Sequence, residues 1–433
     1  MRILHELSPT RLALEAILHQ DNQMYVKELT MAIEDMRENR QTQNKVIFEG
    51  KRLHDIIFKH TGVFTQWHLD LGNKSENAAV MPTWIDTNNP LIVRWQRWEI
   101  GSKDGEAALA WAGQGAEGWV NLEEGKVGGI YSKLVNPAWL TEGALYGTLL
   151  TPIEVAAMIA HEVGHVVSLF GMIGQVDSTC VILVSAMRAR LHLMPKEDRV
   201  KFFSKVHKTT GVDLSKNADA LNTTSSTTLQ MVLTAEVNDQ MRSEFGTPMY
   251  DMRTWEALSD QYAARFGFAV PLATALNKMY RRYDPMAYRS TITYLLVEIA
   301  KLAAAMLLAV AVAISSPLTA ILLLPVLLAI NPHERTYDRP QERIARIRRD
   351  LVEQTKDRTM AKEKSTAVLR DIAVLDALLK EVKLRESFYE KIWTFFSAYT
   401  RDQNSAMREL QALEELMNND MFVAAAELNA LAN

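Results

Sequence analysis

The residues best suited to do chemistry are two histidines and a glutamate in the motif His161-Glu162-Val163-Gly164-His165. In a helix, side chains four positions apart lie on one face, so both imidazoles can reach the same cation. Glu162 is rotated by about 100° from His161, which places its carboxylate beside the cation rather than on it. There it can take a proton from a metal-bound water. The spacing therefore predicts a zinc site in which Glu162 is the general base.

The residues around this motif indicate a helix that packs in the core. The flanking apolar residues are Val155, Ala156, Met158, Ile159 and Val166. Polar side chains buried without a partner cost free energy. A metal ion supplies the partner that His161, Glu162 and His165 need. The alternative is a chance pair of histidines on an amphipathic helix.

The helix that carries the motif has recognisable ends. Thr151 can cap it, Pro152 takes the first helical position, and Glu154 completes a capping box. Gly171 is the expected stop. The sequence therefore predicts a helix over 151–170.

A catalytic zinc ion needs a third protein ligand, and the best downstream candidate is Glu256, on a helix expected over about 252–266. Asp260 lies four positions later and hence on the same face. Glu256 can ligate the metal while Asp260 accepts the distal ring N–H of a ligand histidine. The alternatives are a solvated acidic face, or other ligands: Glu236 with Asp239 or Gln240, or His192 or His207.

These motifs resemble those of the gluzincin metallopeptidases of the HtpX heat-shock protease and CAAX prenyl protease family. The segment 154–165 matches the family's helix "E-L-x-A-V-L-A-H-E-x-x-H", and 256–260 matches "E-x-x-A-D", with Ser259 in place of the customary alanine. Residues 76–82 are similar to the "N-A-F-A-L-P" strand that borders the active-site cleft. Residues 340–344 are similar to the closing "H-P-x-x-x-x-R-I", but Arg339 replaces the histidine and the spacing to Arg343 is shorter.

The resemblance covers about 77–345 and implies a zincin-type endopeptidase that hydrolyses peptide bonds. An extended protein or peptide substrate would pair with a sheet edge near Asn77 and Ala78, and Zn²⁺ would be the cofactor. The alternatives are a structural or scaffolding protein that retains a metallopeptidase-like domain, and a zinc hydrolase of a non-peptide bond.

The expected fold class is α+β and mostly helical. We expect an N-terminal helical region (1–61), a peptidase domain with a small antiparallel sheet (62–289), an apolar hairpin (290–333) and a C-terminal helical region (334–433) whose start completes the peptidase domain. A hairpin signal lies within the second region, where 119–122 and 127–131 flank a turn.

The apolar stretch 302–330 carries no charge over 29 positions, but Ser315-Ser316-Pro317 interrupts it. Each half spans roughly 20 Å, short of the ~30 Å hydrocarbon core of a bilayer. Both flanks are basic, which favours placing both ends on the cytoplasmic side. The sequence predicts a membrane-associated hairpin, with the catalytic domain facing the cytoplasm. A helical pair buried in a soluble cytoplasmic protein is the alternative.

Composition limits the remaining possibilities. The 433 residues include 48 Lys+Arg and 52 Asp+Glu, a net charge of −4, which gives no long-range attraction for nucleic acid. A single cysteine, Cys180, excludes a disulfide framework and a multi-cysteine metal site. An aromatic cluster near the C-terminus indicates core packing or, as the alternative, self-association. Its members are Phe388, Trp393, Phe395, Phe396 and Tyr399.

Overall fold

The structure is a computed structural model. It describes residues 22–81, 104–112, 118–121, 124–210, 214–215, 217–245, 252–283, 285–288, 291–316, 340–355 and 360–382, together with Val93 and Arg97. The described chain is mostly helical with a small mixed sheet, and it divides between Phe268 and Ala269 into two compact units.

The first unit contains a three-stranded sheet with the order β1-β5-β2, formed by β1 (Thr65–Asp70), β5 (Asn136–Thr141) and β2 (Ala78–Val80). β2 pairs antiparallel with β5, but β1 pairs parallel with it. The prediction of an antiparallel sheet is therefore wrong for β1 and β5. Parallel strands need a long crossover, which local turn signals cannot reveal. The prediction is confirmed for the separate hairpin of β3 (Gly118–Asn121) and β4 (Lys126–Gly129).

Two N-terminal helices, α3 (Gln23–Gln43) and α4 (Gly50–Thr61), confirm the helical prediction for the described part of that region. α4 packs against β1, and α3 packs against α8, the helix that carries the histidine motif. Their fully buried apolar side chains include Tyr25, Leu29, Ile33, Met36, Leu53 and Ile57. These helices thereby help to cover the sheet and α8.

The helix α8 (Pro152–Arg188) has 37 residues, so the predicted stop at Gly171 is wrong. Its start is as expected: the Glu154 carboxylate accepts a hydrogen bond from the Thr151 N–H at 2.7 Å and closes the capping box. A glycine inside a helix costs only about 1 kcal/mol relative to alanine. Packing of the second half of α8 exceeds that cost, as the buried Val181 and Ile182 show.

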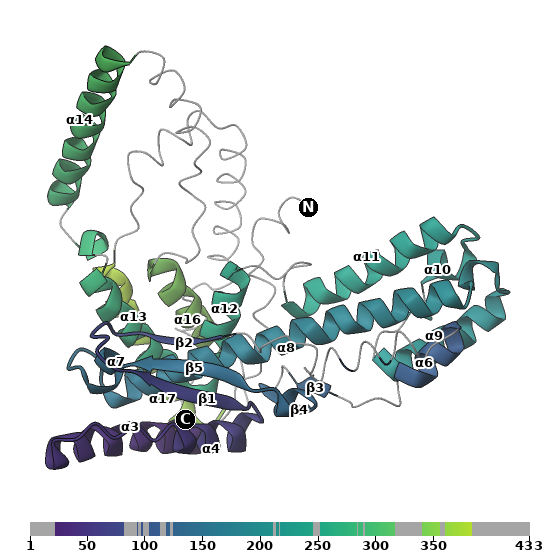
Figure 1. The fold of residues 1–433 in the computed structure, drawn as a ribbon, viewed down its shortest axis with the longest axis horizontal. Helices are drawn as coiled ribbons and strands as arrows, with labels where there is room; N and C mark the ends of the chain where they lie inside the picture. Colours follow the sequence, from purple (N-terminus) through teal and green to yellow (C-terminus); the bar gives the residue numbers. More distant parts are fainter. Residues whose placement is uncertain are drawn as a thin grey trace. The chain divides into compact units, whose positions relative to one another are not determined.

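A group of helices surrounds that second half of α8 (Figure 1). It consists of α6 (Gly105–Ala112), α9 (Lys196–Thr210), α10 (Ala218–Asn222) and α11 (Ser226–Phe245). We call it the helical group. The apolar core that it shares with the second half of α8 includes Phe202, Phe203, Leu214 and Leu229. The described chain between the two predicted zinc-binding segments therefore first continues α8 and then packs against it.

The helix α12 (Met252–Ala263) brings Glu256 to α8 and ends in a π-helical turn, η4 (Ala264–Phe268). Gly164 lies where α8 and α12 meet. A Cβ at this position would lie 2.9 Å from the Ser259 Cα and 2.9 Å from the Tyr262 Cβ. The glycine in the middle of the histidine motif therefore lets the two helices approach closely.

The second unit contains α13 (Ala269–Tyr283), η5 (Pro285–Tyr288), α14 (Thr291–Ser315), α16 (Pro340–Gln354) and α17 (Lys362–Glu381). α13, α16 and α17 pack against one another through buried residues that include Leu272, Leu276, Ile344, Ile347 and Leu375. α16 and α17 confirm the helical prediction for the described part of 334–433. The aromatic cluster at 388–399 lies outside the described residues.

The helix α14 ends at Ser315, where the sequence predicts the break in the apolar stretch. Several of its apolar side chains are more than half exposed, and the largest of these are Ile292, Leu295, Leu296, Ile299, Leu307, Leu308, Val310 and Ile314. The second arm of the predicted hairpin, 318–330, lies outside the described residues.

Among the described residues, one helical stretch is long and apolar enough to cross a membrane, and it is Pro152–Gly174 in α8. Its most apolar part is 78% buried. The burial of this stretch shows that Pro152–Gly174 is part of the core of the first unit.

Candidate metal centre

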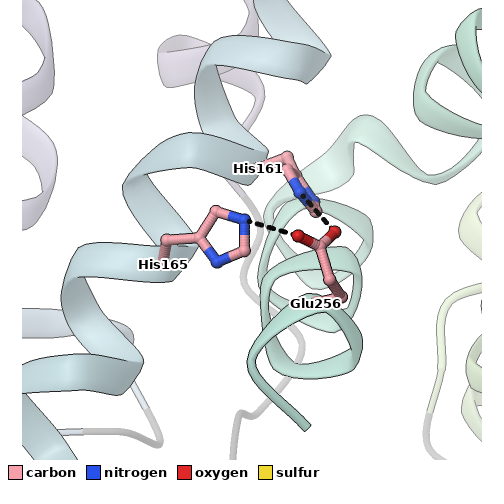
Figure 2. Close-up of side chains that lie close together, drawn as sticks. All are labelled: His161, His165 and Glu256. Carbon is pink, nitrogen blue, oxygen red and sulfur yellow. Dashed lines mark ion pairs between the residues drawn. The ribbon is translucent and has the colours of Figure 1, made fainter. Parts of the chain in front are cut away.

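Two helices bring together the three predicted metal ligands. His161 and His165 come from successive turns of α8, and Glu256 points toward both rings from α12 (Figure 2). Glu256 Oε2 lies 3.4 Å from His161 Nε2, and Glu256 Oε1 lies 3.5 Å from His165 Nε2. One ligand atom from each residue lies within 4.8 Å of the others, and all three residues are buried.

This donor set fits a zinc ion. Tetrahedral zinc with bonds near 2.1 Å separates neighbouring ligand atoms by about 3.4 Å, which is close to the two distances between carboxylate oxygens and ring nitrogens. Two imidazoles and one carboxylate also form one of the usual protein ligand sets of catalytic zinc. The arrangement could hold a metal ion, and three protein ligands leave room for a fourth.

Asp260 lies behind His161 rather than within the ligand set. Its Oδ1 is 3.1 Å from His161 Nδ1, so the ring is oriented with Nε2 toward Glu256 and His165. Burial by itself lowers the pKa of His161, but Asp260 and Glu256 outweigh burial and raise the pKa to about 10. The cluster therefore favours a positive charge at this point, as a site for a divalent cation must.

His165 is held by two residues of α12 to which the sequence assigned no role. Ser259 Oγ lies 2.7 Å from His165 Nδ1, and the Trp255 indole N–H donates to the His165 carbonyl oxygen at 2.9 Å. The Trp255 and His165 rings also meet at 4.3 Å between centroids. The only sequence signal for Ser259 is that it departs from the alanine of the similar family.

Glu162 lies next to His161 on α8 and contacts the sheet. It is only partly buried, and its Oε2 accepts a hydrogen bond from the Val80 backbone N–H at 2.9 Å. Val80 belongs to β2, which pairs only with β5 among the described strands and is therefore an edge strand of the described sheet. The contact with Val80 was not anticipated from the sequence. It places the predicted general base beside the open edge of β2.

Asn77 and Ala78 lie at the start of this edge but differ in their orientation. The Asn77 backbone N–H and C=O both contact Thr141, so they are directed into the sheet. In an antiparallel ladder, consecutive residues direct their backbone groups to opposite sides. Ala78, like Val80, therefore directs its backbone toward the open edge, while the Asn77 side chain is exposed.

The rival ligands do not join the cluster in the part of the chain described. Glu236 accepts a hydrogen bond from the Asn217 side chain at 2.7 Å. The potential metal group contains His161, His165 and Glu256, without His192 or His207. The side chains of Asp239 and Gln240 lie outside the description. Arg343 is buried in the second unit, with Nη1 3.4 Å from the Tyr280 hydroxyl, and Arg339 lies outside the described residues.

Comparison with models of known protein families, with curated proteins and with solved structures yields no match.

Proposed function

We propose that the protein is a zinc-dependent endopeptidase that hydrolyses peptide bonds, with Glu162 as the general base. The observation that carries this proposal is the convergence of His161, His165 and Glu256 in one buried cluster, while Glu162 lies beside an open sheet edge. The sequence resemblance to gluzincin metallopeptidases agrees with this geometry.

The ligand residues would hold the zinc ion that acts as the Lewis acid. A zinc ion held by His161, His165 and Glu256 would polarise the scissile carbonyl and lower the pKa of the attacking water. Asp260 lies 3.1 Å from His161 Nδ1 and would orient the ring so that, with zinc bound, Nε2 faces the ion.

Glu162 would carry the proton. Its carboxylate takes a proton from the attacking water as the water oxygen bonds to the scissile carbon. It then donates that proton to the leaving amine as the C–N bond breaks. The partial exposure of Glu162 gives it access to water and substrate, which the buried ligand residues do not need.

The substrate would bind as an additional strand along β2. The backbone groups of Ala78 can pair with an extended peptide, and the exposed Asn77 side chain can contact it. Main-chain pairing holds many sequences with little discrimination, so an unfolded protein is a suitable test substrate.

The test compares the parent protein with Glu162→Gln on casein. We expect the substitution to lower turnover by about 10²–10⁴-fold, with zinc content unchanged because Glu162 is not a ligand. A chelator should abolish cleavage, and His161→Ala should lose the metal. Equal cleavage by Glu162→Gln would contradict the proposal and favour a scaffolding role. Zinc binding without cleavage of casein would favour hydrolysis of a non-peptide bond.

We also propose that the protein associates with a membrane through 302–330, with the catalytic unit facing the cytoplasm. The supporting observation is that α14 exposes large apolar side chains along its length, which water solvates poorly. Lys278, Arg281 and Arg282 precede this helix and suit an anionic lipid surface.

A further inference from the structure

We propose that Ser259 is a positioning residue for the metal, which fixes His165 through its Nδ1 just as Asp260 fixes His161. This inference rests on the proposed zinc site and deepens it. It adds a residue at a position where the similar family carries an alanine, which has no side-chain hydrogen-bonding group.

The hydrogen bonds around Ser259 set the direction of each proton. A hydroxyl has a single proton to donate. Ser259 Oγ lies 2.8 Å from the Trp255 carbonyl oxygen, which can only accept, and 2.7 Å from His165 Nδ1, which donates or accepts according to the tautomer. Both contacts are hydrogen bonds at once only if the hydroxyl donates to the carbonyl and accepts from the ring. His165 Nδ1 must then carry the hydrogen. The Nε2 lone pair is left free to face Glu256 and a metal ion.

Burial makes this contact hard to replace. Ser259 is fully buried and His165 is 5% exposed. If the hydroxyl is removed, the Nδ1–H loses its acceptor in a place that water reaches poorly, which costs free energy. A ring that turns to recover a partner moves Nε2 away from the other ligands.

Trp255 contacts the same histidine at its backbone and at its ring. Its indole N–H bonds the His165 carbonyl oxygen, and its ring packs against the imidazole. One turn of α12, from Trp255 to Ser259, therefore fixes both the backbone and the ring of His165. The close approach of α8 and α12 at Gly164 makes these contacts possible.

The choice of a neutral partner also suits the charge of the site. The carboxylates of Glu256 and Asp260 together balance the two positive charges of a zinc ion. A second carboxylate behind His165 would leave the cluster negative, whereas the Ser259 hydroxyl orients the ring without adding charge.

The experiment measures zinc dissociation constants by chelator competition for the parent, Ser259→Ala, Ser259→Thr and a control, Ser168→Ala. Ser168 is buried on α8, and its hydroxyl donates to the backbone carbonyl oxygens of Gly164 and His165. We expect Ser259→Ala to weaken zinc binding by about 10–100-fold and to alter the visible spectrum of the Co²⁺ form. Ser259→Thr, which keeps the hydroxyl, and Ser168→Ala should both resemble the parent.

A second measurement uses the parent alone, in case Ser259→Ala does not fold. Imidazole ¹⁵N shifts of the metal-free protein should show His165 with its hydrogen on Nδ1. An Nε2–H tautomer would overturn the inference, and so would parent-like zinc affinity of a folded Ser259→Ala, while both leave the proposed function intact. A parent protein that binds no zinc would instead overturn the proposed function and this inference with it.

Discussion

Two apolar helices of this protein have opposite surroundings. The first part of α8, Pro152–Gly174, is apolar enough to cross a membrane, yet 78% of its most apolar stretch is buried. α14 is also rich in apolar residues, but its large side chains are exposed. Ile159 in α8 is 0% exposed, whereas Ile314 in α14 is 78% exposed.

The comparison teaches that apolar composition does not by itself show whether a helix is buried in the protein or exposed on its surface. α8 is covered by α3, by β2 and by α12, so its apolar residues form the core of the first unit. The polar residues on such a helix are then the informative ones, because His161 and His165 are buried there at a cost that a bound metal ion would offset. On α14, the exposed apolar residues are the informative ones, because water solvates them poorly.

The largest effect should come from placing a charge in the buried helix. Ile159→Asp introduces an unpaired carboxylate beneath the histidine motif, and we expect the free energy of unfolding to fall by about 3–5 kcal/mol. Denaturant unfolding measures this. The control is Ile153→Asp, at a residue 36% exposed in the first turn of α8, where a negative charge is tolerated. Equal stability of the two variants would show that α8 is not a core helix.

A smaller effect, with a different readout, should follow the same change in the exposed helix. Ile314→Asp should leave the free energy of unfolding within about 0.5 kcal/mol of the parent, because the side chain has few contacts to lose. Flotation with vesicles of zwitterionic and anionic phospholipid should nevertheless show membrane affinity reduced by at least about tenfold.

Ile292→Asp provides the control for that measurement. Ile292 is 73% exposed but precedes the uncharged stretch, so its substitution should reduce vesicle binding less. If neither substitution changes flotation, or if the parent does not bind vesicles, the proposed membrane role of α14 is wrong.

The smallest effect concerns the start of α8. Thr151→Ala removes the side chain of the capping box and should cost about 1 kcal/mol in the free energy of unfolding. Thr151→Ser keeps the hydroxyl and should match the parent. Casein cleavage should be unchanged in both, because the cap lies ten residues before His161. A loss of casein cleavage without a loss of stability would contradict the prediction that the cap affects the helix and not the catalytic residues.

The parts of the site that the sequence predicts are those set by spacing within one helix. His161 and His165 lie four positions apart, as do Glu256 and Asp260, so each pair shares a face wherever its helix lies. The capping box at Thr151 is equally local. The proximity of Asp260 to His161 is also predictable, because a buried imidazole needs a partner for its second nitrogen.

What the sequence does not predict depends on how distant elements meet. The contact of Ser259 with His165 requires the close crossing at Gly164, and the contact of Val80 with Glu162 requires the edge position of β2. The parallel pairing of β1 with β5 and the continuation of α8 past Gly171 likewise depend on tertiary packing.

The length of α8 has a mechanical consequence. The helix runs about 55 Å from end to end, with the histidines near one end and the helical group around the other. Both imidazoles are thus fixed to the same stiff rod as that group, while Glu256 is attached to a different helix. A force that tilts α8 at its far end would move the two rings together, and the distances between the ligand atoms would change to the extent that α12 does not follow.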